Sequence, residues 1–451
     1  MNSPEPNKKF ESNREAALSQ RKYKAYSEYK ESGVEWLDRV PNHWSTVALK
    51  MIIDVRDGTH DTPSYVEPSE NSYPLVTSKD VTGGTLNLSD CKQISLEDYE
   101  SIITRSGVAK GDILMPMIGT VGFPILLEQD LKIAIKNLAL FRTSENNDAL
   151  SKKYLLYFLN CNECSVQFSL ESRGGVQNFV SLGTLRNLGL PLVPREEQTQ
   201  IANFLDHETA KIETLIDKQQ QLIKLLKEKR QAVISHAVTK GLNPDAAMKD
   251  SGVEWLGEVP AHWGVVKLSY KMKLLSGDSI TSNSIEPEGQ YPVYGGNGLR
   301  GYTSQYNCDG EYVLIGRQGA LCGNINLATG QFFASEHAVV VYPYQVFDIS
   351  YLSEFLRFMN LGQYSVSAAQ PGISVDRVNS LKIAVPPLSD QVTIGEKIKL
   401  IVRQYEELSL KASEQVKLLQ ERRTALISAA VTGKIDVRDW KNSRTAMEAT
   451  T

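Results

Sequence analysis

The sequence lacks several features that define large classes of proteins. It has no stretch of 18 or more apolar residues, so no membrane-spanning helix is predicted. Residues 1–32 are polar and lack the apolar centre of a secretory signal. Cysteine is scarce and odd in number, with five residues, which is typical of a protein in the reducing cytoplasm. We therefore expect a cytoplasmic protein without a membrane partner.

Recognisable catalytic and cofactor-binding motifs are also absent. The sequence has no Gly-x-x-x-x-Gly-Lys-Ser/Thr loop and no Gly-x-Gly-x-x-Gly after a predicted strand. It has no Asn/Asp-Pro-Pro-aromatic run, the active-site signature of amino-group DNA methylation. Cys161 and Cys164 form one Cys-x-x-Cys without a second pair of ligands, so we interpret them as buried thiols rather than a zinc site. No catalytic residue, cofactor site or metal site is therefore predicted in this chain.

Length and composition indicate a globular protein of several domains. A chain of 451 residues corresponds to roughly two to four domains. Its apolar content of 41% and charged content of 23% are usual for proteins with hydrophobic cores. The net charge of −4 argues mildly against a protein that binds nucleic acid by bulk charge, although local patches can still do so.

A thirteen-residue block occurs twice. SGVEWLDRVPNHW at 32–44 and SGVEWLGEVPAHW at 251–263 agree at ten of thirteen positions, and their numbering differs by an offset of 219. Such a match predicts two copies of one structural unit. The tryptophans of the blocks, which we expect to anchor two equivalent bodies to a common scaffold, are Trp36, Trp44, Trp255 and Trp263.

Further repeats follow at a smaller offset, 193 in the numbering. KRQAVISHAVTKG at 229–241 resembles RRTALISAAVTGK at 422–434, and VPREEQ at 193–198 resembles PPLSDQ at 386–391. Each copy therefore consists of the block, a globular body, a proline-marked junction and a long helix. Because the offset falls from 219 to 193, the first body is the longer one, by the difference between these two offsets.

The two predicted helices have the pattern of a coiled coil. Residues 196–238 contain no glycine or proline, and apolar residues recur with a mean spacing of 3.5. The second copy keeps the same register, so we predict that the helices pair with each other in antiparallel orientation. A coiled coil that only dimerises the protein is the alternative. The predicted helix-pairing seam is Ile201, Leu205, Ile212, Leu215, Leu222, Leu226, Ile394, Ile398, Ile401, Leu408, Leu419 and Leu426.

The bodies at 45–190 and 264–384 are predicted to be strand-rich, with polar loops. Short Val/Ile/Tyr runs alternate with turn residues, and each body ends in an amphipathic helix and a polar loop. Loops on a rigid sheet usually carry recognition. We interpret His60 as a turn residue that hydrogen-bonds a ligand or the main chain, with a metal ligand or general base as the alternative. We interpret His337 as a packed structural residue.

Taken together, the chain resembles the specificity subunits of type I restriction-modification systems. The resemblance rests on the doubled SGVEWL block and on the doubled helix ends at 229–241 and 422–434. It rests also on RDGTHDTP at 56–63 and on YPVYGGNGLRGY and IGRQGALCGNI at 291–302 and 315–325. It covers about residues 20–437.

The resemblance implies an α+β protein with two pseudo-symmetric globular target recognition domains separated by two long antiparallel coiled-coil helices. The expected domains are an N-terminal extension (1–30), recognition domain 1 (31–190), a central spacer helix (191–245), recognition domain 2 (246–384), a C-terminal spacer helix (385–437) and a polar tail (438–451).

The same resemblance implies a non-catalytic subunit that binds double-stranded DNA. Each recognition domain would read one half of a bipartite, asymmetric target, and the helices would set the spacing and dock two modification (methyltransferase) subunits. Restriction subunits with translocase and nuclease activity would complete the complex. S-adenosylmethionine, ATP and Mg are expected in those partners and not in this chain.

The expected DNA-binding residues are polar loop residues, because Arg, Asn and Gln can read base edges. They are Thr59, His60, Thr62, Ser78, Lys79, Arg173, Gln177, Asn178, Asn297, Arg300, Arg317, Gln318 and Gln370. The alternative for each is an ordinary solvated loop residue. Alternatives for the whole chain are a coiled-coil interaction scaffold and a self-sufficient methyltransferase or nuclease, although the chain has no room for an added catalytic domain.

Overall fold

The computed structural model describes residues 23–34, 36–119, 121–142, 149–171, 179–319, 321–365 and 372–441. The chain divides into two compact units. Unit 1 contains the residues up to Lys218 and those from Gln415 onward, and unit 2 contains Gln219–Glu414. Both long helices, α6 (Arg195–Lys240) and α9 (Leu388–Val431), contribute to both units. The predicted domains instead assign each long helix to a domain of its own. Because the two units divide the helices differently, the boundaries of the spacer helices stay a prediction.

Unit 1 contains two four-stranded sheets. One has the strand order β11-β10-β13-β4, and its central strands β10 and β13 are antiparallel and almost wholly buried, as their apolar sequences ILMP and LALFR require. The other has the order β12-β6-β9-β5 and contains the parallel pair β6 and β12. The strands of this unit are β1 (Tyr29–Val34), β2 (Leu37–Pro41), β3 (Ser45–Ala48), β4 (Asp54–Asp57), β5 (Tyr65–Val66), β6 (Ser72–Val76), β7 (Val81–Thr82), β8 (Thr85–Leu86), β9 (Lys92–Ser95), β10 (Ile113–Pro116), β11 (Ile125–Leu126), β12 (Ala134–Ile135), β13 (Leu138–Arg142) and β14 (Gly189–Leu192).

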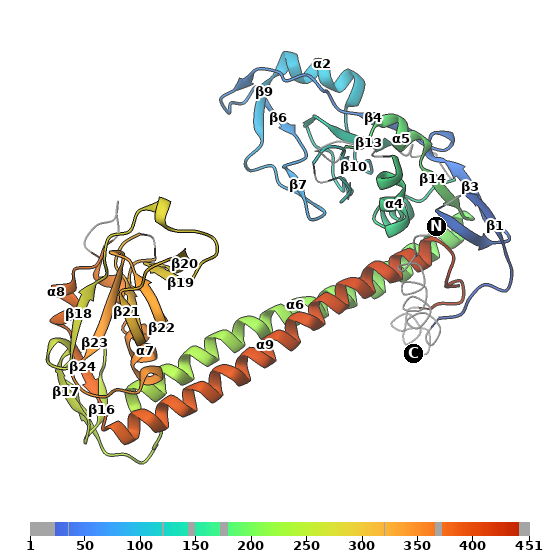
Figure 1. Cartoon of the computed structure of the whole chain (residues 1–451). Helices are drawn as coiled ribbons and strands as arrows, with labels where there is room; N and C mark the ends of the chain where they lie inside the picture. Colours follow the sequence, from blue (N-terminus) through green and yellow to red (C-terminus); the bar gives the residue numbers. More distant parts are fainter. Residues whose placement is uncertain are drawn as a thin grey trace, which may run out of the picture. The chain divides into compact units, whose positions relative to one another are not determined.

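Short helices complete unit 1. Helix α2 (Leu96–Ser106) lies beside β6 and β9 (Figure 1), and the Ser95 side chain caps its first turn by accepting the Asp98 N–H. The others are α3 (Lys152–Leu159), α4 (Asn162–Glu171) and α5 (Leu182–Asn187). Tyr154 of α3 is fully buried, and its hydroxyl donates to the Pro191 carbonyl (2.9 Å), which ties α3 to β14.

Unit 2 is built on one six-stranded sheet with the order β18-β23-β21-β22-β19-β20. Helix α7 (Ile349–Phe358) packs on β21 and β22 (Figure 1), and its first turn is capped by the Asp348 carboxylate, which accepts the Tyr351 N–H (2.8 Å). Helix α8 (Val375–Asn379) precedes the last strand. The strands are β15 (Met248–Asp250), β16 (Glu258–Pro260), β17 (Gly264–Lys267), β18 (Met272–Ser276), β19 (Tyr291–Gly295), β20 (Gly298–Thr303), β21 (Cys308–Gly316), β22 (Ile325–Ala334), β23 (Ala338–Pro343) and β24 (Lys382–Val385).

The two bodies share a plan and differ by an insertion. In unit 1 the end of β12 pairs in parallel with β6, and in unit 2 the end of β22 pairs in parallel with β19. Unit 1 has β7, β8, β9 and α2 between β6 and β10, whereas unit 2 has β20 between β19 and β21, which accounts for most of the greater length of the first body. The prediction of two pseudo-symmetric α+β bodies with two long helices is confirmed.

The long helices pair in antiparallel orientation within each unit. In unit 1 the start of α6, at Ile201 and Leu205, shares a core with Ile427 and Val431 at the end of α9. In unit 2 the end of α6, at Ile234 and Val238, shares a core with the start of α9, at Ile394 and Ile398. Each core continues into its body, so the helix ends hold the bodies as well as each other.

Two equivalent ion pairs join the helices. Arg423 of α9 bonds to Glu213 of α6 in unit 1, and Arg230 of α6 lies 3.8 Å from Glu406 of α9 in unit 2. The offset of 193 relates Glu213 to Glu406 and Arg230 to Arg423. Each helix therefore supplies the arginine of one ion pair and the glutamate of the other, which is expected when two copies of one helix pair in antiparallel orientation.

The predicted helix-pairing seam is wrong at three of its positions. Leu215, Leu222 and Leu408 are 45%, 43% and 49% exposed. Their neighbours Ile216, Ile223 and Ser409 are buried or half-buried instead. Spacings of three and four alternate in either order in a heptad, and adjacent apolar residues such as Leu215–Ile216 satisfy both orders. The other nine residues are buried or half-buried: Ile201, Leu205, Ile212, Leu226, Ile394, Ile398, Ile401, Leu419 and Leu426.

Candidate nucleic-acid interface

A histidine and a tryptophan fasten the first body to the start of α6. The His43 Nε2 lies 2.8 Å from one oxygen of Glu197, and the Trp44 indole N–H donates to the other (3.2 Å). Trp44 is fully buried, and the Glu197 side chain is only 6% exposed. We call these three residues the first clasp. A buried carboxylate is stable only when donors surround it, so the clasp fixes the body to the helix.

The second block forms the same arrangement in unit 2. His262 Nε2 and the Trp263 indole N–H bond to one oxygen of Asp390 at 2.8 and 3.2 Å. These residues are the second clasp, and Asp390 is the equivalent of Glu197 at the offset of 193. Although burial acts to raise the pKa of Asp390, the bonds from His262 and Trp263 lower it.

The earlier tryptophan of each block packs inside its body. Trp36 contacts Phe158 of α3, with ring centroids 6.4 Å apart, and lies over Gly189. Trp255 contacts Phe355 and Phe358 of α7 at 6.3 and 6.0 Å. These two side chains hold the block on α3 in unit 1 and on α7 in unit 2, whereas the clasps hold it on a long helix.

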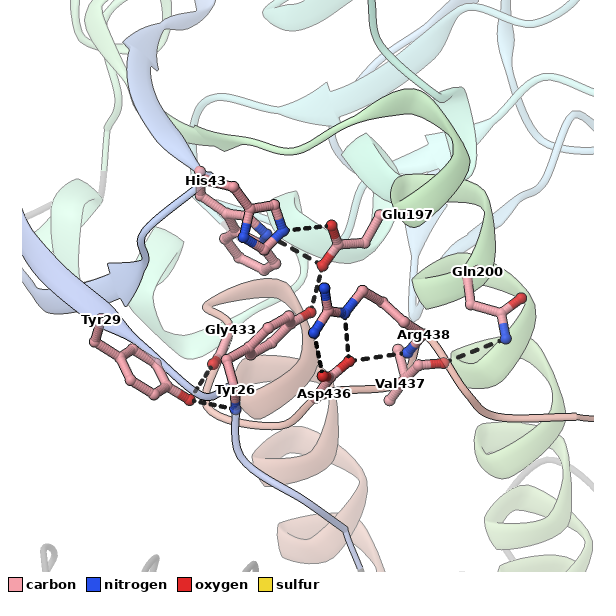
Figure 2. Close-up of polar contacts among 10 residues, drawn as sticks. Tyr26, Tyr29, His43, Glu197, Gln200, Gly433, Asp436, Val437 and Arg438 are labelled. Atoms are coloured by element: carbon pink, nitrogen blue, oxygen red, sulfur yellow. Dashed lines mark hydrogen bonds and ion pairs between the residues drawn. The ribbon is translucent and has the colours of Figure 1, made fainter.

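The two ends of the described chain meet at the first clasp (Figure 2). The buried Tyr26 hydroxyl donates to Glu197 (2.5 Å), and the Arg438 guanidinium lies over the Tyr26 ring at 5.0 Å. Arg438 also donates to Asp436 (2.7 Å), whose own N–H donates to the Lys24 carbonyl (2.7 Å). We call this set the terminal junction. Residues of the predicted extension 1–30 and tail 438–451 thus take part in the core of unit 1.

Burial and charge set the protonation of the terminal junction. Burial and the bond to Glu197 raise the pKa of Tyr26, which therefore remains a neutral donor. Burial acts to raise the pKa of Asp436, but the bonds from Arg438 lower it. The junction therefore holds one buried carboxylate and one ion pair, each with its donors in place.

The loops at one end of each sheet share a main-chain arrangement, which we call the loop frame. In unit 1 it joins the segments 57–59, 76–79, 117–118, 135–138 and 180, and in unit 2 it joins the segments 276–278, 294–297, 317–318, 334–338 and 373. Five hydrogen bonds of one frame, each from a main-chain N–H to a main-chain carbonyl, have a counterpart in the other frame. In unit 1 they run from Gly58 to Leu138, Thr59 to Ile135, Lys136 to Val76, Met117 to Asn137 and Val180 to Met117. In unit 2 they run, in the same order, from Gly277 to Ala338, Asp278 to Ala334, Ser335 to Tyr294, Arg317 to His337 and Ile373 to Arg317.

Glycine is required at one position of each loop frame. A Cβ atom on Gly58 would overlap the Ile135 carbonyl, and one on Gly277 would overlap the Ala334 carbonyl. The close approach lets the Thr59 and Asp278 N–H groups reach those same carbonyls (2.9 and 3.0 Å). The two loop frames therefore have the same main-chain requirement and differ in their side chains.

In the first loop frame, His60 bridges two partners. Its Nε2 lies 2.9 Å from Asp57, and its Nδ1 lies 2.9 Å from the Asn137 side-chain oxygen. These bonds raise the pKa of His60, and Arg105 bonds to the other oxygen of the buried Asp57. His60 is thus a positioned, exposed histidine. Within the described ranges no three His, Cys, Asp or Glu side chains form a metal-ligand set.

Other predicted residues of the first body lie at the same loop frame. Thr62 is exposed, and its hydroxyl accepts a bond from the Lys136 amino group. Ser78 and Lys79 follow β6, next to the carbonyl of Val76 that accepts the Lys136 N–H. Lys79 is exposed, and Ser78 is half-buried. Thr59, His60, Thr62, Ser78 and Lys79 are therefore brought together.

The second loop frame carries a different set of side chains. Arg317 is half-buried and donates to the Ser276 hydroxyl (3.1 Å), and Gln318 beside it is exposed. Asn297 is exposed and lies 3.5 Å from the Asn324 amide. Arg300 on β20 lies over Gly295, a member of this frame. His337, predicted as a packed residue, is half-buried: its side chain is 39% exposed and lies 3.2 Å from Glu336.

Four predicted contacts lie outside the described residues: Arg173, Gln177, Asn178 and Gln370. Sequence reasoning missed Lys136 and Asn137, because they end one of the short apolar runs that predict strands, KIAIKN at 132–137. It also missed the clasp acids Glu197 and Asp390, although each follows its proline junction at the same offset of 193.

The remaining features of the sequence have plain structural positions. Cys161 and Cys164 are fully buried in unit 1, and burial raises the pKa of both thiols. No helix in the described part of the chain has the length and apolar content needed to span a bilayer.

Two bodies with equivalent clasps and loop frames, each held on the paired helices, define a class of proteins built from two copies of one unit. The family model for the type I restriction modification DNA specificity domain matches residues 41–225 and 260–418. The chain belongs to this family of type I specificity subunits.

Some proteins resemble this chain in sequence, and solved structures resemble it in fold. A putative type I restriction enzyme specificity subunit, MjaX, of Methanocaldococcus jannaschii is 25% identical over 89% of this chain and 96% of its own length. The EcoprrI specificity subunit of Escherichia coli is 44% identical, but over 28% of this chain and 32% of its own length. The HsdS subunit from Thermoanaerobacter tengcongensis has a TM-score of 0.51 at 17% identity, covering 88% of this chain and 98% of its own. A chain from structural work on assembly and conformational transition of the type I R-M system has a TM-score of 0.61 at 18% identity, covering 87% and 98%.

Proposed function

We propose that the chain reads a bipartite DNA sequence and sets the distance between its two halves. The single observation that carries this proposal is the pair of loop frames with equal main chains and unequal side chains. Thr59, Lys79 and Lys136 occupy the positions that Asp278, Asn297 and Ser335 occupy in unit 2. Equal main chains place the side chains similarly, and unequal side chains select different bases, so the two half-sites should differ.

The paired helices would dock the catalytic partners. Leu215, Leu222, Leu225, Leu408 and Leu418 are exposed on α6 and α9, by 43–51%. Apolar residues exposed along a helix mark protein interaction surfaces. We propose that two methyltransferase subunits bind there, that they carry S-adenosylmethionine, and that restriction subunits with ATP and Mg join the complex. The present chain would then be the non-catalytic subunit.

Methylation mapping tests the proposal. The chain is produced with its modification subunit in a host without DNA methylation, and N6-methyladenine is mapped by single-molecule sequencing. We expect one split motif with two unlike halves and a fixed gap. An assembled complex that leaves the genome unmethylated would contradict the proposal.

A non-catalytic coiled-coil scaffold for protein partners is the second candidate, favoured by the net charge of −4. It predicts no binding of the complex to DNA. A DNA reader instead requires binding that weakens steeply with salt, because phosphate contacts release counterions. Binding of the assembled complex to the mapped duplex at several salt concentrations separates the two.

A further inference from the structure

Each loop frame holds a half-buried cation. Lys136 follows β12 in unit 1, and Arg317 follows β21 in unit 2. Within the described ranges neither side chain has a carboxylate within 4 Å, whereas Arg56 and Arg142 of the first body pair with Asp54 and Asp112. A cation that is partly removed from water without an acidic partner is costly, and an anionic ligand would remove that cost.

Neutral polar groups hold both cations in place. The Lys136 amino group donates to the Thr62 hydroxyl, and an Arg317 Nη1 donates to the Ser276 hydroxyl at 3.1 Å. A hydroxyl orients a cation but does not neutralise it. Among the described residues, therefore, no carboxylate offsets the charge of either side chain.

The main chain at both cations is fixed by the loop frame. The Lys136 N–H donates to the Val76 carbonyl (2.9 Å), and the Arg317 N–H donates to the His337 carbonyl (2.8 Å). Yet the cations come from different frame positions, since the equivalent of Lys136 in unit 2 is Ser335 and the equivalent of Arg317 in unit 1 is Met117. The frames thus present one such cation each, from two different loops.

We propose that Lys136 contacts an acceptor oxygen or nitrogen of DNA in the half-site read by unit 1, as the counterpart of Arg317 in unit 2. This inference rests on the proposed function. Because Lys136 and Arg317 stand at different frame positions, the contacted group lies at a different place in each half-site. The acceptor belongs either to a backbone phosphate or to the edge of a guanine, and both are recognised by lysine.

The test uses the complete complex with its modification subunit and three variants of the chain. Lys136→Gln removes the charge, Lys136→Arg keeps it, and Lys132→Gln is a matched control at an exposed lysine that precedes β12, whereas Lys136 follows this strand. Each complex is checked for assembly, its methylation motif is mapped, and its binding to the wild-type duplex is measured against salt. We expect Lys136→Gln to weaken binding by roughly 5- to 150-fold. Lys132→Gln should bind like the wild type.

The two possible acceptors give different results. A phosphate contact leaves the motif intact and lowers the slope of log affinity against log salt by about 0.9. A base contact keeps the slope and relaxes the motif at one position of one half only. Lys136→Arg should retain more affinity than Lys136→Gln in both cases.

The inference is overturned if an assembled Lys136→Gln complex binds and methylates as the Lys132→Gln complex does. Failure of the proposed function is a different result: the wild-type complex itself then shows neither a split motif nor salt-dependent binding, and the inference is lost with it.

Discussion

At the scale of single residues, the two clasps show how burial changes the contribution of a carboxylate to stability. Glu197 accepts bonds from Tyr26 and Trp44 and contacts His43, and it is almost fully buried. Asp390 contacts His262 and Trp263 of the block and accepts a longer bond from the Ser389 hydroxyl (3.4 Å), and its side chain is 35% exposed. Bonds to a buried charge contribute more than bonds to an exposed one, so the clasps should differ in strength.

Neutralising each acid tests this difference. We expect Glu197→Gln to lower the free energy of unfolding by about 1.5–3 kcal/mol, because an amide places an N–H against donors in a buried site. Asp390→Asn should cost about 1 kcal/mol or less, since solvent screens that clasp. Thermal and urea unfolding of the assembled protein measure both. An equal or larger loss for Asp390→Asn would contradict the comparison.

The second clasp should also depend on pH. Because its bonds lower the pKa of Asp390, they stabilise the folded protein above the pKa of the unfolded chain and lose this effect as the pH falls through the lowered value. The stability difference between wild type and Asp390→Asn should thus shrink as the buffer is acidified below about pH 5. A difference that grows on acidification would show that the carboxylate is not held by these donors.

At the scale of elements, the long helices show what the sequence can and cannot decide. The repeat and its register predicted two antiparallel helices, and both are present. The predicted helix-pairing seam is wrong at Leu215 and Leu222 because each is followed by an isoleucine, and the apolar pattern does not indicate which of two neighbouring residues is buried between the helices. Leu408 failed because Ser409 faces inward, which only the packed structure reveals.

The recognition loops show a second limit of the sequence. Thr59, His60 and Lys79 could be picked as polar loop residues, but their meeting with Lys136 and Asn137 depends on a parallel bridge of Thr59 to Lys136 and on the parallel pairing of β6 with β12. Five strands and a helix lie between these two strands in the sequence. Parallel pairs have no local turn signal, because their connections are long. The residues were therefore predicted one at a time, whereas their arrangement was not.

The ion pair between Arg423 and Glu213 allows a test of the helix pairing. Arg423→Glu should lower stability by about 0.2–1 kcal/mol through like-charge contact with Glu213, and the added Glu213→Arg should restore most of it. Arg422→Glu, a change at the exposed neighbouring residue, serves as the control and should have little effect. Urea unfolding of these variants and the wild type measures the coupling. No recovery in the double variant would contradict the observed register.

At the scale of the whole molecule, the terminal junction of unit 1 takes the place of a continuous chain segment in unit 2. In unit 2 the segment 241–247 leads directly from α6 to β15, and the equivalent place in unit 1 is filled by Tyr23–Glu28 and Ile435–Trp440, from the two ends of the described chain. The Lys24–Asp436 bridge and the Arg438–Tyr26 contact hold them together.

A circularly permuted chain should therefore fold. Joining residue 441 to residue 23 by a short Gly/Ser linker and opening new ends within 242–247, which are mostly exposed, keeps the contacts of the terminal junction. We expect normal assembly and an unchanged methylation motif. Opening the chain within β21 instead is the control and should abolish folding, because that strand lies inside the six-stranded sheet. A misfolded first permutant would mean that the connection at 242–247 is required.

The division of the chain into two units also determines the order in which they can fold during synthesis on the ribosome. Unit 2 is one continuous stretch, Gln219–Glu414, whereas unit 1 needs residues on both sides of that stretch. Synthesis proceeds at about 5–20 residues per second, so the first body waits tens of seconds for the end of α9 and for the terminal junction. Until then Ile201, Phe204 and Leu205 lack their partners Ile427, Ala430 and Val431. The later half of the nascent chain is thus the first to reach its native state, and the earlier half is the one that chaperones must protect.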